Sequence, residues 1–237
     1  MSTLRQPQAC WALLLGLTAC AQPGKAPTPD PMLVASQQLV AAEPGQWATS
    51  LSRVLEYDRD GSRTAMADAL VAELHKQPEA RGAQAAVAAL GALGGKQADN
   101  FLLETLADRG DLAIDAAVAL GAGPSLTRAE LLIDVANDPL APATLRAACA
   151  ASLLRHGQGQ QVALLIRAVL LAGSPGGNPL LQQLGLPRKS RWAHERYLIQ
   201  TALLAVAGDD FGLDTDASWP DLKATADRVS AWLESGQ

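Results

Sequence analysis

The sequence predicts an all-α protein in which antiparallel helix pairs stack along the chain into an α-solenoid. Similar alanine-rich segments recur three times, at residues 85–91, 116–121 and 147–154. The leucines in equivalent places, Leu90, Leu120 and Leu153, lie 30 and 33 residues apart. A repeat of this length with two helices per unit is typical of stacked helical repeats. Only 4% of the residues are aromatic while 49% are hydrophobic, so small side chains must fill the interior and allow close helix approach.

Apolar residues recur at the helical period along most of the chain, which predicts a succession of helices. We expect them at residues 32–42, 47–56, 63–76, 79–93, 96–108, 111–120, 127–137, 142–156, 158–171, 189–208 and 221–234. Glycine in a left-handed conformation ends a helix without a steric penalty. We therefore expect helix ends at Gly91, Gly94, Gly95, Gly110, Gly121, Gly123, Gly157 and Gly173.

The pattern divides the chain into five parts. An export signal at residues 1–19 is followed by a proline-rich tether at 20–31, an N-terminal helical cap at 32–62, the repeats at 63–208, and a capping turn and helix at 209–237. The repeat rhythm breaks at residues 173–188, which we expect to be a surface insertion. A solenoid needs its last apolar face covered, and we expect Trp232 and Leu233 in the last helix to cover it.

The first twenty residues have the features of an export signal. Arg5 precedes an apolar run at residues 9–17, which is shorter than the roughly 20 residues that span a bilayer. Leu17-Thr18-Ala19-Cys20 resembles the lipobox of bacterial lipoprotein precursors. This resemblance implies cleavage before Cys20, a diacylglycerol on its sulfur and a fatty acid such as palmitate on its amine. The alternative is an ordinary signal peptide that contains a cysteine by chance.

The segment after Cys20 predicts an extended tether and a cellular location. Residues 21–31 contain four prolines and no apolar side chain larger than alanine or proline, so they should be extended and reach roughly 35 Å. Residue 21 is Ala21 rather than aspartate. In the lipoproteins that the leader resembles, this implies passage to the outer membrane, where the protein faces the periplasm.

The repeats resemble HEAT repeats, especially the short bacterial kind. The resemblance rests on Ala-Ala-Val-Ala-Ala-Leu-Gly at residues 85–91, its near copy at 116–121, and the segment at 142–154. It covers residues 60–208, but the arginine and aspartate positions usual in the family are incomplete here. The alternative is an irregular helix bundle without superhelical order.

Charge and cysteine content exclude some classes of protein. The chain has 19 basic and 24 acidic residues, a net charge of −5, and no basic stripe, so we expect no nucleic-acid binding. Cys10 and Cys20 belong to the leader, which leaves Cys149 alone in the folded part. One thiol cannot form an internal disulfide, and Cys149 should be a small buried hydrophobe.

We find no catalytic constellation. His194 and Glu195 begin like a zinc-protease helix, but Leu198 stands where a second histidine is required. Residues 94–97 lack the remainder of a phosphate-binding loop, and residues 173–176 lack the spacing of a nucleophile elbow. We therefore predict no catalytic residue, no metal and no cofactor.

Two acidic turns were tested as calcium loops. Asp58 and Asp60 have neither the glycine nor the closing glutamate at the required positions. A denser group of carboxylates comprises Asp209, Asp210, Asp214 and Asp216. It could ligate calcium, but capping and a solvated turn are the favoured interpretation.

A basic segment after the insertion is the candidate partner-binding site. It comprises Arg188, Lys189, Arg191, Trp192 and Arg196. The alternative is a solvated helix start in which Trp192 and Tyr197 pack inward.

These patterns favour a lipid-anchored scaffold in the cell envelope that has no catalytic activity and binds an unknown protein partner. Membrane attachment would be through Cys20. A second hypothesis is an envelope enzyme or enzyme subunit, because some HEAT-like proteins resemble bilin lyases, although no residue set here carries that activity. A third is a structural spacer without a specific ligand.

Overall fold

The structure is a computed structural model that describes residues 30–57, 62–124, 126, 128–174, 177–187, 191–214 and 218–235. The predicted export signal, Cys20 and nearly all of the tether lie outside the described residues. Within these ranges all regular secondary structure is helical, as predicted. None of the described helices is both long enough and apolar enough to cross a membrane.

The described residues form twelve α-helices and two short 3₁₀ helices. The α-helices are α1 (Pro31–Val40), α2 (Trp47–Glu56), α3 (Arg63–Lys76), α4 (Ala83–Leu93), α5 (Lys96–Asp108), α6 (Ala113–Ala122), α7 (Ala129–Asn137), α8 (Ala143–Arg155), α9 (Ala163–Leu170), α10 (Pro179–Gln183), α11 (Ala193–Ala207) and α12 (Trp219–Glu234). The 3₁₀ helices are η1 (Pro44–Gln46) and η2 (Gly159–Val162).

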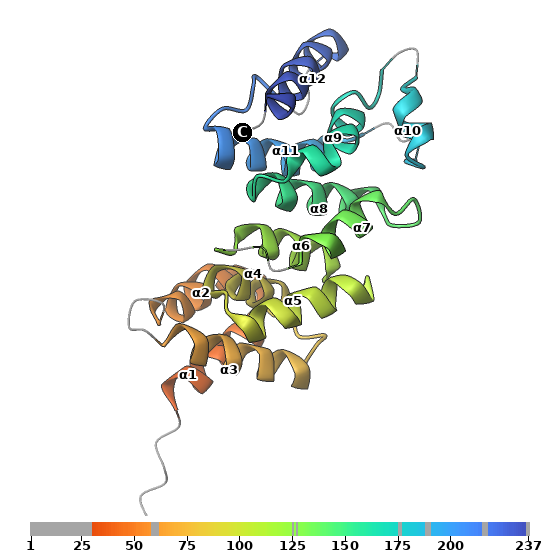
Figure 1. Cartoon of the computed structure of the whole chain (residues 1–237). Helices are drawn as coiled ribbons and strands as arrows, with labels where there is room; N and C mark the ends of the chain where they lie inside the picture. The colour runs from red at the N-terminus through yellow and green to blue at the C-terminus, as the bar shows by residue number, and fades with distance from the viewer. Residues whose placement is uncertain are drawn as a thin grey trace, which may run out of the picture. The chain divides into compact units, whose positions relative to one another are not determined.

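The helices from Pro31 onward belong to one compact unit and stack as a solenoid-like repeat. One row runs through the unit, because α2 packs on α4, α4 on α6, α6 on α8, and α8 on α11. Each later member also packs on a partner from the other row: α4 on α3, α6 on α5, α8 on α7, and α11 on α9. Figure 1 shows these layers in succession. The predicted all-α stack of helix pairs is thereby confirmed.

Two glycines of the recurring segments set the spacing of this row. A Cβ on Gly91 of α4 would lie 2.4 Å from the Ala119 carbonyl oxygen of α6. A Cβ on Gly121 of α6 would lie 2.8 Å from the Ser152 Cα of α8. Neither distance leaves room for a side chain, so both positions allow the backbones of neighbouring helices to touch.

The prediction that Gly91 and Gly121 end helices was therefore wrong. Both lie inside helices that continue to Leu93 and Ala122. Gly110 and Gly123 also lack the expected left-handed conformation, and Arg109 adopts it at the end of α5 instead, with φ 55°. The expected left-handed glycines are confirmed at four helix or turn ends: Gly94, Gly157, Gly173 and, with a wider φ, Gly95.

The insertion contains a short helix that the sequence analysis missed. Asn178 accepts a hydrogen bond from the Leu180 amide, 3.0 Å away, and Pro179 occupies the first turn of α10. Asn178 also donates to the Ala168 carbonyl of α9, 3.1 Å away. The Asn-Pro pair is a recognised helix start, so the signal was present in the sequence.

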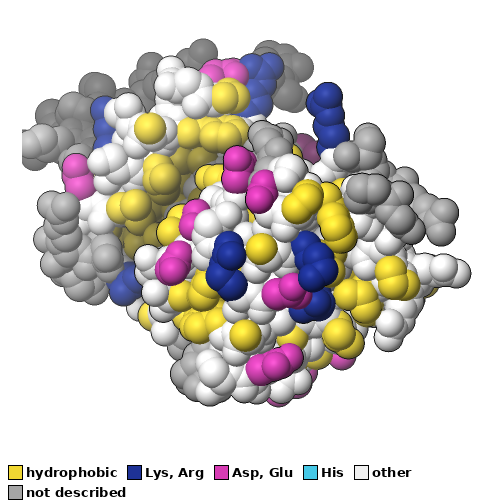
Figure 2. Space-filling view, turned by 90° about the horizontal axis from the view of Figure 1, so that it is seen from above, with side chains coloured by type: hydrophobic (Ala, Val, Ile, Leu, Met, Phe, Trp, Pro, Cys, Tyr) yellow, Lys and Arg dark blue, Asp and Glu magenta, His cyan; other side chains and the backbone are white. Residues whose placement is uncertain are grey.

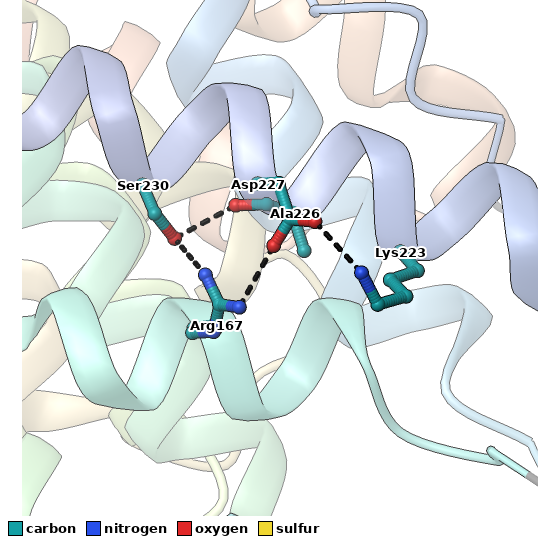
Figure 3. Close-up of polar contacts among 5 residues, drawn as sticks. All are labelled: Arg167, Lys223, Ala226, Asp227 and Ser230. Carbon is teal, nitrogen blue, oxygen red and sulfur yellow. Dashed lines mark hydrogen bonds and ion pairs between the residues drawn. The ribbon is translucent and has the colours of Figure 1, made fainter.

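Helix α12 packs on α9 and η2, in agreement with its predicted role at the end of the stack. Leu233 is buried and Trp232 is half-buried against Phe211, with ring centroids 5.4 Å apart. Figure 3 shows the polar part of this contact, in which Arg167 of α9 donates to Ser230 and Asp227, each at 2.8 Å.

These polar contacts respond to acid. Lys223 and, next, Arg167 hold the pKa of Asp227 below its ordinary value. Because the pKa is lowered in the folded state, this contribution to stability is complete above about pH 4 to 5 and is lost as the pH falls through the lowered pKa.

Candidate functional site

The predicted partner-binding segment does not form one exposed surface. Arg188 and Lys189 lie outside the described residues, and Arg191 is exposed. Trp192 is buried, as is Arg196, whose guanidinium donates to the Ala172 carbonyl. The inward packing expected of Trp192 is confirmed, but Tyr197 is 55% exposed, so the same expectation for Tyr197 was wrong.

The acidic turn after α11 uses its carboxylates within the chain. Asp209 accepts the Phe211 amide at 2.7 Å, and Asp210 accepts the Gly212 amide at 2.9 Å. Asp216 of the same group, like Asp58 and Asp60, lies outside the described residues. Among the residues that the structure describes, no group of three or more His, Cys, Asp or Glu side chains is placed to hold a metal ion.

Cys149 is fully buried on α8, as predicted. Burial raises the pKa of its thiol to about 12. A thiol with this pKa carries almost no thiolate at neutral pH, so Cys149 packs as a small apolar residue and does not react.

Two adjoining hollows on the helix pairs α3–α4 and α5–α6 form the candidate site. The first has a volume of about 550 Å³ and lies between the end of α3, the α3–α4 turn, α5 and the α5–α6 turn. The second, of about 420 Å³, lies along α4, α6 and α11. Gln84 and Asp111 line both, so the two hollows are neighbours, and together we name them the Gln84 groove.

The first hollow combines an apolar floor with an acidic wall. Leu74, Phe101 and Leu112 line it, and the rings of Phe101 and His75 are nearly perpendicular with centroids 5.3 Å apart. Its carboxylates are Glu79, Glu104, Asp108 and Asp111, all exposed. Within the described part of the chain, none of these four makes an ion pair.

The cations nearest to this acidic wall are engaged elsewhere. Arg81, which also lines the hollow, pairs with Glu43. Arg109 follows Asp108 directly in sequence, but its guanidinium pairs with Asp138, 2.5 Å away. This contact, after the hydrogen bond from the Leu140 amide, holds the pKa of Asp138 below its ordinary value. Among the described residues, the four carboxylates of the hollow are therefore exposed and belong to no ion pair.

The positions of Glu104 and Asp108 are unfavourable for the helix that carries them. The two residues are four apart on α5, so their like charges lie on one helix face. Asp108 is also the last residue of α5, where the helix dipole is negative and no basic residue occupies the last turn. The like-charge pair costs roughly 0.2–0.5 kcal/mol, and the dipole roughly 0.3–1 kcal/mol, at an exposed site.

The second hollow is more apolar and holds one half-buried carboxyl group. Ile114, Val118 and Leu198 line it together with Asp115. Burial raises the pKa of Asp115 above its ordinary value, while a hydrogen bond with Gln84 opposes the shift. A raised pKa disfavours the charged form, so a cation placed next to Asp115 would stabilise its carboxylate.

Figure 2 views the molecule from above, at the α12 end of Figure 1. Figure 2 shows one side of the molecule hollowed, with hydrophobic side chains inside the hollow and acidic side chains along its edge. Basic and acidic side chains lie beside each other on the nearer surface, and some basic side chains also lie around the margin of the hollow.

No protein-family model, curated protein or solved structure matches the chain. The function must therefore be inferred from its own residues.

Sequence analysis missed the Gln84 groove, because its lining residues come from three separate stretches of the chain, 74–88, 101–122 and 194–198, that only the fold brings together. One signal was nevertheless visible. Two acidic residues lie toward the end of the segment 96–108 without a basic neighbour on the same face, whereas basic residues are favoured at the C-terminal end of a helix.

Proposed function

We propose that the protein is a lipid-anchored component of the bacterial cell envelope that acts as a non-enzymatic scaffold. In this proposal it binds another protein in the Gln84 groove. The observation that carries the proposal is a pair of neighbouring hollows over successive helix pairs, because stacked helical repeats commonly bind their partners on such extended surfaces.

The proposed cellular location rests on the sequence of the first 21 residues. The sequence Leu17-Thr18-Ala19-Cys20 at the end of a short apolar run supports lipidation at Cys20, and Ala21 supports transfer to the outer membrane, facing the periplasm. A tether reaching roughly 35 Å would hold the helical unit away from the lipid surface. The groove would then be accessible to proteins of the periplasm.

We also propose that the repeats are of the HEAT type. The support is the recurring alanine-rich segment, whose glycines Gly91 and Gly121 occupy equivalent places. Each lies where its helix meets the next member of the row, α6 or α8. A shared packing role explains why the same residue recurs at this spacing.

Replacing Cys20 by serine should release the protein from the membrane, because serine cannot form the thioether to diacylglycerol. We expect Cys20→Ser to lose incorporation of an alkyne-labelled palmitate analogue and to move from the membrane pellet to the soluble fraction after a carbonate wash. Cys10→Ser, which changes a cysteine inside the leader, is the matched control and should behave as the wild type. Retention of label and membrane association by Cys20→Ser would remove the proposed anchor.

A further inference from the structure

We propose that the Gln84 groove binds a positively charged segment of a partner protein, with its Lys or Arg side chains on the acidic wall and an apolar side chain on the floor. This inference rests on the proposed function and adds the chemistry of the partner. It excludes an acidic or purely apolar partner segment from this site.

The charge of the first hollow defines the required complement. Four exposed carboxylates line it, and within the described residues none of them has an ion-pair partner. The one arginine of the lining, Arg81, is already paired with Glu43. An incoming cation would therefore meet uncompensated negative charge and would not have to displace an internal salt bridge.

The carboxylates of Glu104 and Asp108 destabilise the free protein, which indicates that they do not serve to stabilise the fold. Glu104 and Asp108 repel each other across one turn of α5, and Asp108 also opposes the dipole at its end. Residues that weaken their own element without an internal compensation are concentrated at functional sites. A bound cation would relieve both effects, so binding and stability are expected to depend on these two residues in opposite directions.

The shape of the groove favours a polypeptide segment over a single small cation. The two hollows are neighbours that share Gln84 and Asp111, so a segment of several residues is needed to contact both. Phe101 and Leu112 provide apolar surface in the first, and Ile114 and Val118 provide it in the second. Alternating cationic and apolar side chains match this sequence of surfaces.

The test measures binding of a defined probe to the full-length lipidated protein in a non-ionic detergent. The probe is a fluorescein-labelled ten-residue peptide of Lys, Leu and Gly, and its counterpart has Glu in place of each Lys. We expect the cationic peptide to bind, the acidic one not to bind, and the affinity to fall as salt is raised from 50 to 200 mM. Fluorescence anisotropy gives the dissociation constants.

The decisive variant is the double substitution Glu104→Gln with Asp108→Asn, which keeps side-chain size and removes both charges. We expect it to weaken binding of the cationic peptide by about tenfold. The matched control is Glu130→Gln with Asp134→Asn on α7, because these residues are also exposed, also four apart, and line neither hollow. The control should bind the peptide as the wild type does.

Thermal unfolding of the same two variants separates a binding role from a structural one. Removing the charges of Glu104 and Asp108 should raise the Tm by about 2 °C, because repulsion on α5 disappears. A lower Tm would show that these residues serve the fold and would overturn the inference.

Unchanged peptide binding in the groove variant, or an equal loss in the α7 control, would also overturn the inference. The scaffold function would survive either outcome if a photo-cross-linker placed in the groove still captures a partner in cells. Failure of the scaffold function is therefore distinguishable from failure of the charged-segment proposal.

Discussion

Replacing Arg146 by alanine is expected to lower the free energy of unfolding by about 3–5 kcal/mol. Arg146 lies on α8 and is completely buried. Its Nε donates to the Ala136 carbonyl at the end of α7, 2.8 Å away, and its Nη1 donates to the Leu184 carbonyl after α10, 2.7 Å away. One side chain thus joins a helix pair to the insertion.

Several terms contribute to this loss. Hydrogen bonds to a charged group are worth roughly 1.5–3 kcal/mol each, and alanine would leave two carbonyls unpaired and a cavity behind them. Removing a buried charge offsets part of the loss, because burial already disfavours the guanidinium and lowers the pKa of Arg146. The lost hydrogen bonds and the cavity outweigh this gain, because the alanine side chain can make neither of the two contacts.

Urea unfolding followed by circular dichroism measures the change. Arg155→Ala on the same helix is the control, because Arg155 is only half-buried and its side chain makes no hydrogen bond to another described residue. This variant should stay within about 0.5 kcal/mol of the wild type. Proteolysis between residues 173 and 188 should also become faster in Arg146→Ala. A loss below about 1 kcal/mol would refute the bridging role.

Alanine at Gly91 or Gly121 is expected to destabilise the protein by about 2 kcal/mol each. Alanine has a helix propensity about 1 kcal/mol better than glycine, which alone would stabilise α4 and α6. The new Cβ would, however, approach the backbone of Ala119 or Ser152 far inside van der Waals contact. Backbone atoms cannot rotate away as a side chain can, so the helices must move apart and the steric term prevails.

Gly110→Ala is the matched control for these variants. A Cβ on Gly110 would meet no heavy atom within 4 Å, and Gly110 has no positive φ, so alanine should be neutral or slightly stabilising there. Calorimetry of the three variants gives the comparison. If Gly91→Ala and Gly121→Ala unfold at or above the temperature of Gly110→Ala, the row is not held by close backbone contact.

The sequence predicted the helices better than the roles of individual residues. The bounds of Trp47–Glu56, Arg63–Lys76 and Lys96–Asp108 were predicted without error, because each segment has a strong apolar period and a clear break at both ends. The predicted helix at 158–171 is instead η2 followed by α9. Gly159 there lies where a Cβ would meet Leu154 and Leu233, a constraint that only the folded neighbours impose.

The errors share one physical cause. Gly91 and Gly121 have the same local sequence context as a helix end, and only the position of the next helix shows that they are packing residues. Arg196 was placed in an exposed basic patch because it is charged, yet it is buried and its guanidinium donates a hydrogen bond to the Ala172 carbonyl. The Gln84 groove could not be predicted either, since distant segments form it.

Site-specific photo-cross-linking in cells tests the central claim most directly. A benzophenone side chain at Thr105, which lines the first hollow, should yield one discrete product with another protein. The product should become weaker with Glu104→Gln and Asp108→Asn and with Cys20→Ser, and it should be missing when the benzophenone stands at Asp134 on α7. The same products from Thr105 and Asp134, or none from Thr105, would contradict an envelope scaffold that binds its partner in the Gln84 groove.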